Sequence, residues 1–187
     1  MSLGTSVVSG MQAALLLARG RSDGLRYVED DMAGAARSFW AAAICLPAFV
    51  CLRLLAWMGG GMPSHAGHVF ALDLVSFGVG WCGFAVLSYR LVGAMGLRER
   101  WPRFITLWNW CNLVQYLMLV AASLPALLGL PELVGQTAWL AAIGWALWLE
   151  WFMTGLALGV PGVVAAGLVA MDVAIGLFVA GFAGSLG

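Results

Sequence analysis

Lysine is absent from this sequence, and charged residues of any kind make up only 10% of its 187 residues. A typical soluble domain carries about 25% charged residues. All nine basic residues are arginines, and nine acidic residues balance them, so the formal net charge is zero. This balance gives no reason to expect a nucleic-acid partner, which a basic patch would favour. The scarcity of charge favours a chain that lies largely within a membrane.

Catalytic motifs and metal-binding spacings are also missing. The sequence contains no HExxH, no P-loop, no G-x-S-x-G and no dinucleotide fingerprint. Both histidines, His65 and His68, lie at the outer start of the second apolar run, whereas a haem held between helices needs histidine deep inside the spans. The cysteines form no CxxC pair and are expected to be small buried hydrophobic residues; they are Cys45, Cys51, Cys82 and Cys111. We therefore expect a protein that is not an enzyme and has no cofactor and no metal.

Apolar residues, by contrast, make up 63% of the chain. A helix needs about 20 apolar residues to cross the hydrocarbon core of a bilayer, and links rich in glycine and proline separate five runs of at least that length. The runs are 38–58, 68–94, 104–129, 137–158 and 162–185. They predict an all-α fold, a polytopic membrane bundle of five transmembrane helices. The link GVPG predicts an antiparallel hairpin of the last two runs, with a single re-entrant unit as the alternative.

The first 37 residues are predicted to form a helical segment at the membrane interface, ahead of a transmembrane domain over residues 38–187. Leu25, Val28, Met32 and Ala36 recur at helical spacing, with charged residues between them. This pattern is typical of an amphipathic helix that lies in the interface. A helix that packs on the bundle is an equal alternative.

The arginines predict the orientation of the chain. Four of them precede the first span and three lie between the second and third spans, whereas the links after the first and third spans have none. The positive-inside rule then places the N-terminus in the cytoplasm and the C-terminus outside. Because lysine is absent while alanine and glycine are abundant, the composition is typical of a bacterial protein, so we expect the bacterial inner membrane.

Five ionisable residues fall inside the predicted spans, where each is costly and therefore a functional hypothesis. Arg53 and Asp73 lie about equally far from the outer ends of two adjacent antiparallel spans, so we expect a structural ion pair between them. Arg90, near the inner end of the second span, is placed to reach a carboxylate or the water outside.

Glu150 and Asp172 lie roughly 12 Å and 15 Å deep from the inner ends of the last two spans, at 1.5 Å per residue. Trp148 and Trp151 flank Glu150 but face largely the other way on a helix. Two carboxyl groups held together away from water can share one proton, which suits a proton relay and equally a structural hydrogen bond. The polar cluster expected around them contains Asn109, Asn112, Gln115, Tyr116 and Arg90.

Five spans behind a cytoplasmic segment resemble the Yip-type membrane proteins. In eukaryotes that family is associated with Rab GTPases and vesicle traffic. The stretch GLRYVEDDMAGAARSFWAAAICLP over residues 24–47 is also similar to the region before and within the first span of small bacterial membrane proteins. The resemblance concerns the number of spans and residues 20–60, and it implies a topology but no functional residue.

Three functions are compatible with these features. The absence of an internal repeat and the short links favour a non-enzymatic scaffold or accessory subunit of a membrane assembly. Its partners would be membrane lipids and another integral membrane protein or a second copy of the chain. The alternative is a small ion- or proton-coupled transporter that uses Glu150 and Asp172. An intramembrane enzyme that uses the same two residues is the third.

Overall fold

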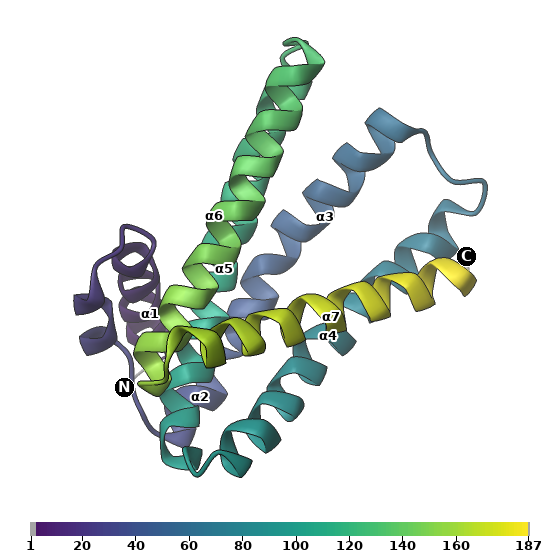
Figure 1. The fold of residues 1–187 in the computed structure, drawn as a ribbon. Helices are drawn as coiled ribbons and strands as arrows, with labels where there is room; N and C mark the ends of the chain where they lie inside the picture. The colour runs from purple at the N-terminus through teal and green to yellow at the C-terminus, as the bar shows by residue number, and fades with distance from the viewer. Residues whose placement is uncertain (1–2, 187) are drawn as a thin grey trace.

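The computed structural model describes residues 3–186, which form seven α-helices and two short 3-10 helices (Figure 1). In chain order these are α1 (Leu3–Leu17), η1 (Ser22–Tyr27), α2 (Met32–Ser38), α3 (Trp40–Gly60), α4 (Ala66–Ala94), η2 (Arg98–Arg100), α5 (Trp101–Leu127), α6 (Glu132–Leu158) and α7 (Gly162–Leu186). Five of the described helices are long and apolar enough to cross a membrane, and they coincide with the five predicted runs. The all-α fold class and the multi-pass membrane character are thereby confirmed. Residues 1, 2 and 187, at the limits of the two predicted domains, lie outside the described residues.

The link between α6 and α7 depends on Gly159, which has the left-handed backbone conformation with φ 64°. Its N–H donates to the carbonyl oxygen of Gly155 at 2.9 Å, which ends α6. A side chain at this position would also meet the guanidinium group of Arg100. Because α6 has 27 residues and α7 has 25, each is long enough to cross a membrane, as the hairpin interpretation requires.

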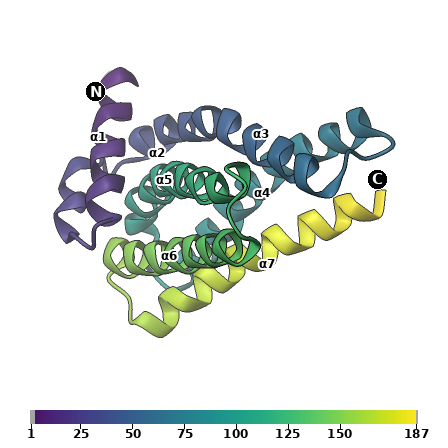
Figure 2. The same cartoon turned by 90° about the horizontal axis from the view of Figure 1, so that it is seen from above.

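The helices meet at one end of the molecule and separate towards the other (Figures 1 and 2). α5 lies at the centre and packs against α1, α2, α3 and α6, whereas α7 packs along α4. The α5–α6 hairpin therefore diverges from the α4–α7 pair, with α3 leaning between them. We call the end that carries α1 and α2 the converging end, and the end with the α3–α4 link the splayed end.

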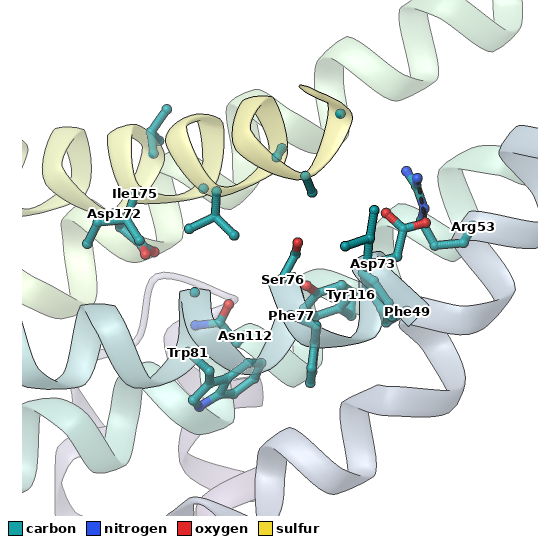
Figure 3. Close-up of a pocket in the computed structure, with 18 of the residues that line it drawn as sticks. Phe49, Arg53, Asp73, Ser76, Phe77, Trp81, Asn112, Tyr116, Asp172 and Ile175 are labelled. Atoms are coloured by element: carbon teal, nitrogen blue, oxygen red, sulfur yellow. Dashed lines mark hydrogen bonds and ion pairs between the residues drawn. The ribbon is translucent and has the colours of Figure 1, made fainter. Parts of the chain in front are cut away.

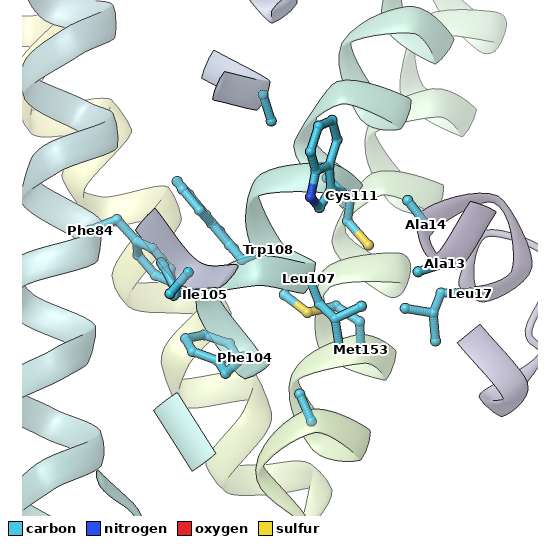
Figure 4. Packing of buried hydrophobic residues seen from close by; sticks show 14 of the residues in the cluster. Ala13, Ala14, Leu17, Phe84, Phe104, Ile105, Leu107, Trp108, Cys111 and Met153 are labelled. Carbon is cyan, nitrogen blue, oxygen red and sulfur yellow. The ribbon is translucent and has the colours of Figure 1, made fainter. Parts of the chain in front are cut away.

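The apolar core lies at the converging end (Figure 4). Leu17 of α1, Phe84 of α4, Leu107 of α5 and Met153 of α6 are all fully buried there. Phe84 also stacks on Trp108, with ring centroids 4.4 Å apart. Because one cluster draws residues from all seven of the described α-helices, the N-terminal helix and the spans share a single core.

The single helix that the sequence predicts before the first span is divided into two short elements in the structure. The helical spacing of Leu25, Val28, Met32 and Ala36 does not form one helix, because η1 ends at Tyr27 and α2 begins only at Met32. The side chain of Asp31 accepts a hydrogen bond from the N–H of Gly34 at 2.6 Å and so fixes the start of α2. The packing alternative describes α1, whose buried residues face the bundle; they are Ser6, Gly10, Ala13, Ala14 and Leu17.

An ion pair joins the extended residues before α2 to α2 itself. Arg37 Nη2 donates to Glu29 Oε2 at 2.7 Å, and Ser6 Oγ of α1 donates to the same oxygen at 3.4 Å. The hydrogen bond from Arg37 holds the pKa of Glu29 below its ordinary value of 4.5. A carboxyl group with a lowered pKa in the folded state stabilises the protein above its unfolded-state pKa, and this contribution is lost as the pH falls through the folded-state value.

We therefore expect Glu29→Gln to remove part of the acid sensitivity of the N-terminal segment. At neutral pH the variant should be less stable by about 0.5–1 kcal/mol, since the pair is partly exposed. The difference from the unmodified protein should shrink as the pH falls below 4.5 and through the folded-state pKa of Glu29, as measured by thermal unfolding in detergent at a series of pH values. Glu132→Gln is the matched control, because Glu132 is exposed and accepts a hydrogen bond from Gln136 in its own helix. A difference that stays constant with pH would contradict this assignment.

Candidate functional site

Two acidic side chains from the last hairpin meet inside the bundle. Glu150 of α6 is only 6% exposed, and Asp172 of α7 is partly buried. Their carboxyl groups lie close enough to influence each other's charge. Trp108 of α5 donates its indole N–H to Asp172 Oδ2 at 3.2 Å. The similar depth predicted for the two carboxyl groups thus corresponds to closeness in space.

The Glu150 side of this pair has unused hydrogen-bonding capacity. Its Oε1 is buried and lacks a hydrogen-bond partner among the described residues, as does the hydroxyl of Thr154 one turn further along α6. Leaving a buried polar group unpaired costs about 1–3 kcal/mol, so such an atom calls for a functional explanation. Two carboxylates in contact repel each other unless a proton or another cation lies between them. The pair is therefore a place where one positive charge can bind.

A pocket of about 690 Å³ lies between α3, α4, α5 and α7, and Asp172 is part of its lining (Figure 3). Asp172 and Asn112 lie on one side of this space, and the Arg53–Asp73 pair lies on the other. The pocket exists because the α4–α7 pair diverges from α3 and α5 towards the splayed end. Asp172 is thus the member of the carboxyl pair that a molecule in the pocket would meet.

The ion pair expected between Arg53 and Asp73 is present. Arg53 Nε and Nη2 each lie 2.7 Å from Asp73 Oδ2, so one carboxylate oxygen accepts two hydrogen bonds. Aromatic rings also meet between α3 and α4. The ring centroids of Phe49 and Phe77 lie 4.8 Å apart, and those of Trp57 and Phe70 lie 6.1 Å apart. Long side chains therefore bridge the gap between these two helices at the splayed end.

Three of the polar residues grouped by the sequence face the pocket or the neighbouring helix α6. Asn112 and Tyr116 line the pocket together with Asp172, and Asn112 donates to the carbonyl oxygen of Trp108 at 2.9 Å. Gln115 does not line the pocket, but donates to the carbonyl oxygen of Ala146 at 2.9 Å and so ties α5 to α6.

The other two residues of the predicted cluster lie elsewhere. Asn109 faces α2 and α4: its Oδ1 accepts from Trp81 Nε1 at 2.6 Å, and its Nδ2 donates to Ser38 Oγ at 2.7 Å. Neighbouring helices cover this part of α5 on several sides. The polar residues of α5 therefore do not all face the same neighbouring helix. Arg90 is exposed near the end of α4 and does not line the pocket. This position agrees with the second of the two predictions for Arg90, that its side chain reaches the water outside.

Sequence reasoning missed the aromatic side of the pocket. Phe77 and Trp81 follow Asp73 at intervals of four on α4, and Trp108 precedes Asn112 and Tyr116 at the same interval on α5. Positions four apart lie on one helix face, so this spacing was the available signal. Trp148 and Trp151 do point outward as predicted, at 38% and 41% exposed.

Comparisons of the chain with models of protein families, with curated proteins and with solved structures find no match. A function is therefore inferred from the geometry of the pocket and the carboxyl pair.

Proposed function

We propose that this protein is a small ion- or proton-coupled carrier whose working group is the pair formed by Glu150 and Asp172. One observation carries the proposal: Asp172 lines a pocket within the membrane-spanning bundle and lies close to Glu150, whose Oε1 is buried without a partner among the described residues. Ionisable residues within spans mark ion and substrate pathways in membrane proteins. The pocket gives the pair access to a bound molecule. A carboxyl pair that only joined α6 to α7 by a hydrogen bond would not need such a pocket.

The proposed location is the bacterial inner membrane, with the converging end in the cytoplasm. The arginines of the first 26 residues and of the α4–α5 link belong to elements that contact one another at this end, and the positive-inside rule assigns such an end to the cytoplasm. Arg100 and Arg103 also donate to the carbonyl oxygens of Leu158 and Ala157, at the C-terminal end of α6. A positive charge at this end of a helix interacts favourably with the helix dipole. The pocket and the C-terminus would then lie towards the outer side.

A pH-jump measurement on proteoliposomes tests the proposal without a known substrate. Protein adsorbed on a solid-supported membrane is switched from about pH 8 to about pH 5, and the charge displaced by proton binding is recorded. We expect a transient current that Asp172→Asn reduces at least fivefold, since an amide cannot take up the proton. Asp23→Asn makes the same chemical change at an exposed position on η1 and should leave the current unchanged. Equal currents from both variants would overturn the proposal.

A scaffold or accessory subunit is the second candidate, favoured by a different feature. A groove of about 780 Å³ lies between α3 and the α5–α6 hairpin, and several of its lining residues are small; they include Ala56, Gly59, Ala122, Ala126 and Gly135. Small residues permit close approach of another helix within a membrane. Purification from the native membrane with one stoichiometric partner, together with no pH-jump current, would favour this candidate. The relation to Yip-type proteins stays a proposal about topology.

A further inference from the structure

The pocket beside Asp172 has one wall made of aromatic rings, which we call the aromatic wall; it contains Phe49, Phe77, Trp81, Trp108 and Tyr116. The rings form a continuous series. Phe77 lies 4.8 Å from Phe49, 5.2 Å from Trp81 and 6.1 Å from Tyr116, and Trp81 lies 5.2 Å from Trp108, all between centroids. Three helices contribute to the wall, and its last ring, Trp108, also donates to Asp172. Aromatic faces and a carboxyl group therefore border the same space.

The opposite wall is formed by α7 (Figure 3). Four of the eight α7 residues that line the pocket are small; they are Gly176, Ala180, Ala183 and Gly184. A Cβ atom added to Gly176 would meet no other atom within 4 Å. At Gly176 the space is thus kept open by the absence of a side chain. Its volume of about 690 Å³ lies within the range of about 300–1,000 Å³ that is typical of pockets for drug-sized ligands.

The charges around the pocket are not balanced. Arg53 is engaged with Asp73 through two contacts of 2.7 Å, so this pair contributes no net charge. Asp172 faces Glu150 from α6, and Trp108, Asn112 and Tyr116 from α5. Among the described residues no arginine forms an ion pair with Asp172 or Glu150. A positive charge bound beside Asp172 would therefore come from a proton or from a ligand.

We propose that the pocket binds a hydrophobic organic cation, such as a quaternary ammonium or phosphonium ion with aromatic or alkyl groups. Its charge lies beside Asp172 and takes the place of the proton shared with Glu150, and its apolar groups lie between the aromatic wall and α7. Aromatic faces attract such cations electrostatically and form the cages that recognise quaternary ammonium groups. The charge balance is one cation bound for one proton released to water. This inference rests on the proposed function and names its substrate class.

Tetraphenylphosphonium and tetraphenylborate are matched probes, because they share shape and size but carry opposite charges. Isothermal titration of the purified full chain in detergent should show saturable binding of the phosphonium ion and no saturable binding of the borate ion. Titrations in buffers of different ionisation enthalpy should show about one proton released per cation bound. The affinity should consequently fall as the pH is lowered, since protons and the cation compete for the same carboxyl pair.

Asp172→Asn should weaken binding of the phosphonium ion at least tenfold, whereas Asp23→Asn should have no effect. Phe77→Leu serves as a second variant that retains both carboxyl groups, and it should weaken binding about threefold to tenfold. Equal binding of the two probes, or binding that neither Asp172→Asn nor Phe77→Leu weakens, would overturn the inference. If the pH-jump current is still present in that case, only the substrate class is wrong. If the current is absent as well, the proposed function fails with it.

Discussion

Gly10→Leu is expected to detach α1 from the bundle. A Cβ atom at Gly10 would overlap the indole ring of Trp110, and Trp110 is only 1% exposed, so the ring has no open space to move into. Overpacking of this kind costs about 1–3 kcal/mol. An isolated helix as short as α1, with 15 residues, is marginally stable in water. Hydrogen exchange measured by mass spectrometry should therefore show roughly tenfold or faster exchange over residues 3–17.

Gly4→Leu is the control for this prediction. Gly4 lies on the same helix, and a Cβ atom there would meet no other atom within 4 Å. Both variants add the same side chain to α1, but only one of them changes the contact with α5. Unchanged exchange in Gly10→Leu, or equally fast exchange in both variants, would mean that the close approach of α1 to Trp110 does not hold the helix in place.

The positions of the membrane spans follow from local sequence, which is why they could be predicted. An apolar run of sufficient length forms a helix because the bilayer leaves no other partner for its backbone groups, and glycine ends it where a left-handed conformation is needed, as at Gly159. The ion pair of Arg53 and Asp73 was also predictable, because two adjacent antiparallel spans carry the residues at matching depths.

The pocket was not predictable, because it depends on how the helices cross. Helical spacing places Gly176 and Val179 on the face of Asp172, and all three line the pocket. The spacing does not specify which neighbouring helix that face meets. α7 packs along α4 and diverges from α5, so a space opens where a compact bundle would have had contact. The same limitation explains Asn109, which shares a stripe with Asn112 but faces a different pair of helices.

The N-terminal segment shows where local and tertiary preferences compete. The spacing of Leu25, Val28, Met32 and Ala36 favours one helix, yet Asp31 accepts the Gly34 N–H and sets a new helix start within that stretch. Aspartate prefers this capping position to a helix interior. Identifying the cap from sequence would have divided the stretch into the two short elements that the structure contains.

Gly176→Leu is expected to fill the pocket and weaken binding of tetraphenylphosphonium at least tenfold, while the pH-jump current is retained. Gly176 lies one helical turn beyond Asp172 on the face that lines the pocket, and a Cβ atom there meets open space. Leucine is a better helix former than glycine, so α7 should remain folded. Since both carboxyl groups are unchanged, the variant separates loss of the cation site from loss of the proton site.

Gly167→Leu tests whether the effect of Gly176→Leu is specific to the pocket. Gly167 also lies on α7 in open space, but nine residues earlier, which places it on the opposite helix face and outside the pocket lining. Its leucine should change neither phosphonium binding nor the current. If Gly176→Leu binds the cation normally, the space between α7 and the aromatic wall is not the binding site. If both binding and current are lost in Gly176→Leu alone, the proton reaches Asp172 through the pocket, and one opening serves both ions.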